Sequence, residues 1–297
     1  MNGRNRLHVS QPGFLTTVQD LGRYHYAHLG IAPGGAADAL SLRIGNLLAG
    51  NEENAPALEM TLVGGTFEFE SAATVVLTGS DFGASIPLYT PTEIPAGGGV
   101  RCGPTRSGAR CYLCVRGGIE VPLVLGSAST LVLAGLGGFE GRPLKKGDVL
   151  AVGDQAVRAP GRMRIGIPKR DAIRVTTGPQ ADWFVDGLSG VYRAKEESDR
   201  SAVRLSGPTP VLRRTDQLVT EGASLGAVQV PAGGEPMILL VEHPTTGGYP
   251  KIANVITADL HAAGQLRPRD EVRFEVVSLE QALAALREQE ELIRALV

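Results

Sequence analysis

The chain has 297 residues, of which 43% are hydrophobic and 20% are charged, as is ordinary for a soluble protein of two domains or one large β-rich domain. A formal net charge of −2 with scattered lysines and arginines excludes the basic surface of a nucleic-acid-binding protein, and no apolar stretch approaches the ~20 residues of a membrane span. We therefore expect neither a nucleic-acid partner nor a membrane partner. The start of the chain lacks the apolar core of a signal peptide, and three cysteines, an odd number, favour reduced thiols and a cytoplasmic location.

Short apolar runs separated by many of the 39 glycines and 19 prolines predict numerous short strands and tight turns. An edge strand is expected over 7–10. A helix is expected after Gly34–Asp38, because the apolar residues between 40 and 48 share one face, and Gly50 ends it. Further strands of the first half are expected over 58–62, 66–69, 74–78, 86–89, 111–115 and 149–152, with a flexible loop over 93–99.

The second half of the chain also reads as mainly strands, with two helices. One helix is expected over 252–263, since its apolar residues share a face. The last helix is expected from Leu279, where Ser278 and Gln281 form a capping-box pattern. The strands of this half are expected over 173–176, 204–205, 226–230, 237–242 and 271–277.

Two groups of residues have the types that bind metals, but their spacing argues against a metal site. Cys111 and Cys114 are three apart in a predicted strand, so their side chains would face opposite sides of a sheet. His25 and His28 have no third ligand close by in the sequence. We therefore expect no metal site, with packed thiols and with histidines on the surface or lining a site.

Two motifs occur in order along the chain and are specific in combination: TTVQDLGR at 16–23 and TTGGYPK at 245–251. With them, the chain resembles the biotin-dependent carboxyltransferase family, which includes the C subunit of 5-oxoprolinase, urea amidolyase and allophanate-hydrolase-subunit-like proteins. The resemblance extends over residues 7–277. The other segments that carry it are Gly34–Asp38, Leu58–Leu62, Val115–Gly118, Gly126–Thr130, Ser198–Arg200, Arg204–Leu205 and Gly226–Pro231.

The resemblance implies a mainly β fold of two cyclophilin-like β-barrel domains, with a few short helices and a C-terminal helix. We place the domains over 1–165 and 166–297, because the pattern of short apolar strands is interrupted between roughly 155 and 172 by prolines and interspersed basic residues. The resemblance also implies partners, a homologous B subunit and a hydrolase, the A subunit. Together with this chain they would open 5-oxoproline to glutamate with ATP hydrolysis. This chain would then be one part of a lactam hydrolase, inactive without its partners.

Two alternatives stay open at this point. The first is a biotin-dependent carboxyltransferase component that acts on urea or a related amide, and only this alternative brings in biotin. The second is a regulatory protein that binds a B subunit resembling a kinase inhibitor. Residues at three places depart from the usual family pattern and leave the substrate open: Gly34–Asp38, Ser201–Ala202 and Glu242–Pro244.

Both candidate reactions develop negative charge on a carbonyl oxygen, and several residues of the segments quoted above are candidates to take part in them. Asp20 and Asp38 are candidate bases or would orient the arginines. The simpler interpretation is a loop hydrogen bond for Asp20 and a favourable charge at a helix start for Asp38. Lys251 is the third catalytic candidate, because a cation in the first turn of the predicted helix is placed against the helix dipole. The substrate-binding candidates are Thr17, Arg23, Arg116, Gly117, Gly118, Ser127, Ser129, Arg200, Arg204, Gln229, Thr246, Gly247, Gly248 and Tyr249.

The glycines and arginines among these candidates also have simpler interpretations. Gly117–Gly118 and Gly247–Gly248 would offer backbone N–H groups to the developing charge, or would only form turns that require a positive φ. Arg23, Arg116 and Arg200 would clamp a carboxylate or a phosphate, or would only be soluble surface groups.

Overall fold

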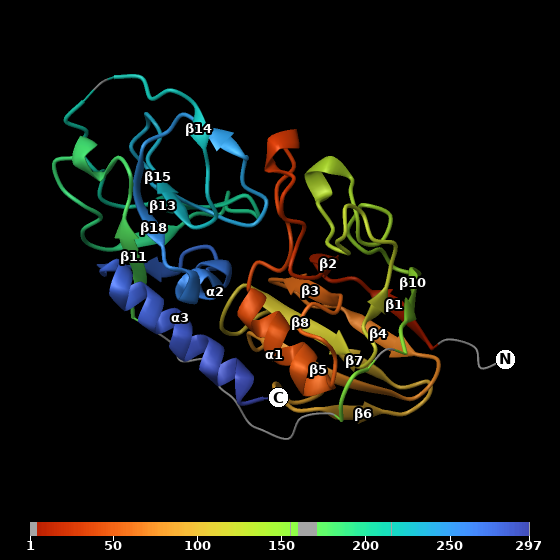
Figure 1. Cartoon of the computed structure of the whole chain (residues 1–297). Helices are drawn as coiled ribbons and strands as arrows, with labels where there is room; N and C mark the ends of the chain where they lie inside the picture. Colours follow the sequence, from red (N-terminus) through yellow and green to blue (C-terminus); the bar gives the residue numbers. More distant parts are fainter. Residues whose placement is uncertain (1–4, 155, 160–170, 215, 297) are drawn as a thin grey trace. The chain divides into compact units, whose positions relative to one another are not determined.

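A computed structural model describes residues 5–154, 156–159, 171–214 and 216–296. The described chain is mainly β, with the α-helices α1 (Ala39–Ala49), α2 (Leu260–Gly264) and α3 (Leu279–Arg294) (Figure 1). Short 3-10 helices are η1 (Ala27–Leu29), η2 (Val132–Ala134), η3 (Ala181–Trp183) and η4 (Thr257–Asp259). None of the described helices is both long enough and apolar enough to cross a membrane.

The chain divides into two compact units. The first unit comprises Met1–Arg23, Gly34–Ile167 and Ile293–Val297, and the second comprises Tyr24–Pro33 and Pro168–Leu292. The boundary expected from the sequence, at 165/166, lies outside the described residues.

Two five-stranded antiparallel sheets build the first unit. One sheet has the order β7-β4-β1-β10-β9 and the other has the order β2-β3-β8-β5-β6. The strands of the first sheet are β1 (Arg6–Gln11), β4 (Thr66–Phe69), β7 (Gly99–Arg101), β9 (Ile119–Glu120) and β10 (Val149–Val152). Those of the second are β2 (Leu15–Gln19), β3 (Ala57–Thr61), β5 (Ala73–Gly79), β6 (Thr92–Ile94) and β8 (Arg110–Val115).

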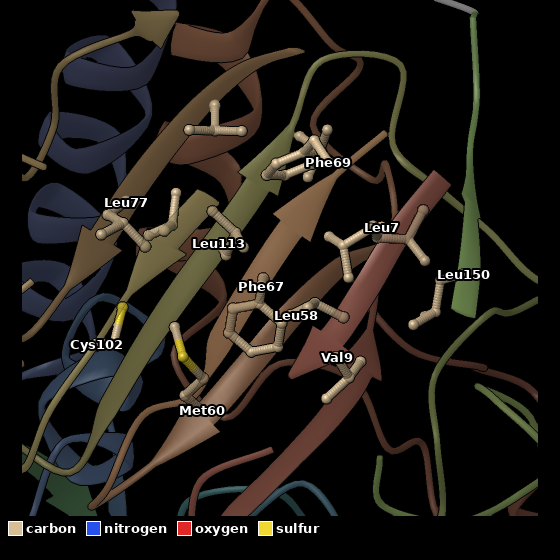
Figure 2. Close-up of a cluster of buried hydrophobic side chains, with 14 of the residues drawn as sticks. Leu7, Val9, Leu58, Met60, Phe67, Phe69, Leu77, Cys102, Leu113 and Leu150 are labelled. Atoms are coloured by element: carbon tan, nitrogen blue, oxygen red, sulfur yellow. The ribbon is translucent and has the colours of Figure 1, made fainter. Parts of the chain in front are cut away.

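Both sheets of the first unit contribute alternate apolar side chains to one core. Leu7 of β1 and Phe67 of β4 come from one sheet, and Leu58 of β3 and Leu113 of β8 come from the other. Figure 2 shows these side chains gathered between the strands, and all four are fully buried. The period of two along each strand places one face of each sheet in this core.

Helix α1 covers the outer face of the second sheet. Asp38 caps its start and Gly50, in the left-handed conformation, caps its end, as the sequence predicts. Cys114 packs with the residues of α1, whereas Cys111 lies in the core of the first unit. The two thiols therefore face opposite sides of β8, as expected, and both are free and buried.

The second unit is built on an eight-stranded sheet of order β19-β12-β13-β16-β15-β18-β11-β20. Its two edge strands are consecutive in the chain, separated only by Arg273, so the sheet curls into a nearly closed barrel. The strands are β11 (Ile173–Thr177), β12 (Tyr192–Ala194), β13 (Ala202–Ser206), β15 (Ala227–Gln229), β16 (Met237–Leu239), β18 (Lys251–Val255), β19 (Glu271–Val272) and β20 (Phe274–Val276). A separate pair, β14 (Glu221–Gly222) and β17 (Thr246–Gly247), is antiparallel.

The predictions of several elements are wrong. The strand over 7–10 exists but is internal, because β1 pairs with both β4 and β10. Residues 86–89 form no strand and make only an isolated bridge at Leu88. The loop expected over 93–99 begins in β6 and ends in β7. The helix expected over 252–263 is a strand, β18, followed by η4 and the short α2.

Candidate functional site

Five predicted site residues lie together in the first unit, around the carboxylate of Asp20. Asp20 is 2% exposed and directly follows β2. It accepts hydrogen bonds from the Ser127 hydroxyl (2.7 Å), the Ala128 N–H (2.7 Å) and the Gly22 N–H (2.8 Å). The Ser129 hydroxyl also donates to it. Asp20 therefore holds the segment 126–130 against the end of β2, as the loop interpretation of this residue predicts.

Arg23 and Thr17 complete this group, and both are buried. The Arg23 guanidinium donates to the carbonyl oxygens of Val124 and Ser129. Thr17 accepts a hydrogen bond from the Gln19 amide, 2.9 Å away. The buried guanidinium is thus held by backbone carbonyls of the loop that Asp20 also binds.

Asp38 belongs to a second buried polar network of the first unit, which the sequence analysis missed. Its carboxylate accepts from the Ser41 N–H (2.8 Å) and the Ser41 hydroxyl (2.6 Å), which is the geometry of a helix cap. Glu59 of β3 accepts from the Ala37 N–H (2.9 Å) and the Tyr112 hydroxyl (2.7 Å). Burial, followed by the charge of Glu59, raises the pKa of Tyr112. A glutamate inside the apolar run ALEMT was the signal for this network.

Arg116, Gly117 and Gly118 form a turn after β8. The Arg116 guanidinium donates to the carbonyl oxygens of Ala49 (3.1 Å) and Arg158 (2.7 Å). The Gly117 N–H donates to Asn51 Oδ1 (2.8 Å) and the Gly118 N–H to the Val115 carbonyl (2.8 Å). Both glycines have positive φ values, and both N–H groups already donate within the protein. The turn interpretation accounts for this pair.

In the second unit, Arg200 forms a buried ion pair with Glu242. The distance from Nε to Oε1 is 2.6 Å, and the two side chains are 6% and 7% exposed. Glu242 is one of the positions at which the sequence departs from the usual family pattern, and here it supplies the counterion of a family arginine. Arg204, by contrast, lies exposed on β13.

Lys251 is the first residue of β18, so the argument that placed it against a helix dipole is wrong. Its side chain is only 6% exposed, and Nζ lies 2.5 Å from Glu221 Oε1. The Gln180 amide also donates to this oxygen (2.8 Å), while Gln180 Oε1 accepts from the Lys251 N–H (3.0 Å). The Lys251 ammonium, followed by the Gln180 amide, holds the pKa of the Glu221 carboxyl below its ordinary value.

Gln229 and Gly247 lie beside this charged group. Gln229 pairs with Lys251 between β15 and β18, and Gly247 pairs with Glu221 between β17 and β14. A Cβ atom on Gly247 would stand 3.2 Å from Gln229 Nε2. Gln229 is 4% exposed, and its buried Nε2 has no hydrogen-bond partner within the described residues.

The second unit also has a cavity of about 580 Å³, and several of the residues that line it are next to Glu221, Gly247 and Lys251 in the chain. Thr220, Gly248 and Tyr249 line it, together with Trp183 and Arg214. The guanidinium of Arg214 lies 4.6 Å from the centre of the Trp183 ring, and Tyr249 is 48% exposed. The volume is within the range of small-molecule sites. Thr246, also predicted, is exposed and begins β17.

The structure thus brings some of the predicted residues into two polar groups, one around Asp20 in the first unit and one around Lys251 in the second, and leaves the others outside both. Sequence reasoning missed Gln180 and Glu221, which complete the group around Lys251. Neither stands in a recognisable motif, and they lie 71 and 30 residues before Lys251. Only the pairing of β14 with β17 brings Glu221 to this place.

Comparison with known proteins gives the family to which this mainly β chain belongs. The family model of the carboxyltransferase domain, subdomain A and B, matches residues 29–276, so the chain belongs to this family. It is 39% identical over 288 residues to the C subunit of 5-oxoprolinase from Haemophilus influenzae, covering 92% of each chain. It is also 39% identical over 299 residues to the C subunit of 5-oxoprolinase from Escherichia coli, covering 96% of this chain and 95% of that protein.

Among solved structures, the crystal structure of the Kluyveromyces lactis urea amidolyase is similar to this chain, with a TM-score of 0.92 and 30% identity. The match covers 100% of this chain but 20% of the urea amidolyase chain. The same fold therefore occurs both in proteins of about this length and as one part of a much longer enzyme.

Proposed function

We propose that this chain is the C subunit of an ATP-dependent 5-oxoprolinase, which converts 5-oxoproline to glutamate together with a homologous B subunit and a hydrolase, the A subunit. The observation that carries this proposal is the 39% identity to two proteins of that name over more than nine-tenths of each chain. The proposal includes two cyclophilin-like domains over 1–165 and 166–297. It also includes a cytoplasmic location, which the three free, buried cysteines suit.

The group around Lys251 suits the chemistry of this reaction better than the group around Asp20. Opening a lactam develops negative charge on its carbonyl oxygen, and a buried ammonium group stabilises such a charge more strongly than one in water. Lys251 is buried, and its ammonium has one acceptor among the described residues, Glu221, so it keeps N–H groups for a carbonyl oxygen. The oxygens of Asp20, by contrast, already accept four hydrogen bonds. We therefore place substrate binding at Lys251, Gln229 and the Gly247–Tyr249 loop.

ATP is required by the complex rather than held by the arginines of this chain that the sequence suggested as phosphate clamps. Arg23 and Arg116 donate to backbone carbonyl groups, and Arg200 is paired with Glu242. These three residues do not fit a triphosphate.

The test is reconstitution. The chain is co-expressed with homologues of both partner proteins, and glutamate formed from 5-oxoproline is measured with and without ATP. We expect ATP-dependent glutamate only with all three proteins, unaffected by avidin. Lys251→Met should lower turnover at least about 100-fold, as loss of an oxyanion-stabilising group does. Lys146→Met, an exposed lysine of the first unit, is the matched control. No glutamate from the complete set would refute the proposal.

A carboxyltransferase component acting on urea or a related amide is the second candidate, favoured by the TM-score of 0.92 to the Kluyveromyces lactis urea amidolyase. This activity would need a biotin carboxylase and a biotinyl carrier, and avidin would abolish it. A complex with the B subunit that forms but has neither activity would instead indicate the regulatory alternative.

A further inference from the structure

Gly247 stands between two side chains that have hydrogen-bonding capacity left for a ligand. Glu221 is its direct partner across the β14–β17 pair, where facing Cα atoms are roughly 5 Å apart. Gln229 Nε2 lies 3.2 Å from the position that a Gly247 Cβ would take. The missing side chain of Gly247 therefore leaves a small space that both Glu221 and Gln229 border.

The Gln229 amide is the donor of this pair. Its Nε2 is buried and finds no acceptor in the described part of the chain. Burying a donor without an acceptor is unfavourable, so a fold that keeps one beside the space left by Gly247 has a reason to do so. Its N–H groups would suit a carbonyl oxygen.

The Glu221 carboxylate is the acceptor. Lys251 Nζ and Gln180 Nε2 both donate to the same oxygen, Oε1. The side chain is 42% exposed, and Oε2 has no hydrogen-bond partner in the described part of the chain. An ionised carboxylate accepts hydrogen bonds and donates none, so Oε2 would suit an N–H group.

We propose that Gln229 and Glu221 recognise the edge of a cis-amide, with Gln229 Nε2 donating to the carbonyl oxygen and Glu221 Oε2 accepting from the amide N–H. A lactam or cyclic ureide ring fixes its amide in the cis form, so its C=O and N–H point to the same side. An open-chain γ-carboxylate has no such edge. The inference rests on the proposed function, since the lactam of 5-oxoproline has this edge and the glutamate product does not.

The cavity of about 580 Å³ is not lined by Glu221, Gln229 or Gly247 themselves, but residues next to them in the chain line it, and it would take the rest of such a ring. Thr220, Gly248 and Pro250 line it, and each is adjacent in sequence to Glu221, Gly247 or Lys251. Trp183, the one tryptophan of the sequence, also lines it. A ligand that enters should therefore change the intrinsic tryptophan fluorescence, which gives a direct signal of binding.

The test is titration of the full chain with three small cyclic probes, followed by Trp183 fluorescence and by calorimetry. 2-Pyrrolidinone has both groups of the edge, N-methyl-2-pyrrolidinone lacks the N–H, and γ-butyrolactone has an oxygen in its place. We expect 2-pyrrolidinone to bind at least about tenfold more tightly than either analogue, because each analogue leaves Glu221 without a donor. Equal affinity for the three probes, or no binding of 2-pyrrolidinone, overturns the proposal.

Variants assign the two contacts. Gln229→Met removes the donor at similar length and should weaken 2-pyrrolidinone binding about tenfold, and Gly247→Ala should do so by filling the space. Glu221→Met should abolish the preference for 2-pyrrolidinone over its N-methyl analogue. Glu275→Met, at an exposed position on β20, is the matched control and should bind like the original chain. Unchanged affinity in Gln229→Met would contradict the assignment, and the probe series remains decisive if Glu221→Met fails to fold.

The proposed function can fail separately from this inference. If the complete complex forms no glutamate but the chain prefers 2-pyrrolidinone, the cis-amide site stands and the 5-oxoprolinase function falls. If the complex is active and Gln229→Met has unchanged kcat and KM for 5-oxoproline, the cis-amide site falls and the function stands.

Discussion

At the scale of single residues, Asp20 joins two segments more than 100 residues apart in the chain. Asp20→Ala would leave two backbone N–H groups and two hydroxyls without their acceptor. Each buried donor left unpaired costs about 1–3 kcal/mol, although hydroxyls can turn to other acceptors. We expect urea unfolding to show a loss of about 3–5 kcal/mol.

The matched control for this prediction is Asp186→Ala, at an exposed aspartate, which should change stability by less than about 0.5 kcal/mol. Loss of a catalytic base would lower turnover and leave stability unchanged, whereas loss of a structural carboxylate lowers stability. If Asp20→Ala folded with ordinary stability but the reconstituted complex lost its turnover, the structural role of Asp20 would be wrong.

Individual residues also show how far the sequence could predict a candidate site. Asp20, Ser127 and Ser129 were each predicted as site residues because they stand in segments that carry the family resemblance, and the structure shows that they lie in contact. Glu221 and Gln180 could not be predicted, because no motif contains them and their position depends on which short strands pair. Glu242 was noticed only as a departure, and its meaning required the buried contact with Arg200.

At the scale of elements, the turn between β8 and β9 contains two adjacent glycines that should tolerate a methyl group differently. Gly117 has φ +93°, and a Cβ there would stand 1.8 Å from the Gly153 carbonyl oxygen. Gly118 has φ +77°, and the nearest atom to its Cβ would be 3.5 Å away. Both substitutions strain the backbone by about 1 kcal/mol, but only Gly117→Ala also forces backbone atoms apart.

We therefore expect Gly118→Ala to cost about 1 kcal/mol and Gly117→Ala at least about 3 kcal/mol, measured by urea unfolding. The two variants are controls for each other, since they share a turn and keep both N–H groups. Equal losses of stability would contradict the close approach to Gly153.

Elements were predicted well where a periodic pattern had clear ends, and less well where two patterns overlapped. Helix α1 has a polar cap at Asp38 and a glycine stop at Gly50, and it was predicted correctly. The apolar residues between 252 and 256 fit a helical stripe, yet residues 252–255 belong to the strand β18. They form a strand because β15 pairs with β18 on one side and β11 on the other. Pairing partners distant in the chain decided this segment, and periodicity alone does not record them.

At the scale of the whole molecule, each unit has its own buried apolar core. Phe67 is fully buried in the core of the first unit, and Ile238 is fully buried in that of the second. A unit with a core of its own can unfold as a cooperative unit. We expect scanning calorimetry of the full chain to resolve two transitions.

Two core substitutions assign the transitions to the units. Phe67→Ala should lower one transition and leave the other in place, since removing a buried phenylalanine costs about 3–5 kcal/mol in its own core. Ile238→Ala, which costs about 2–5 kcal/mol, should lower the other transition. Because each substitution controls for the other, a single transition that both variants lower equally would show that the two cores unfold together. In that case damage to either core would also remove the group around Lys251, and loss of activity in a core variant could not be assigned to one unit.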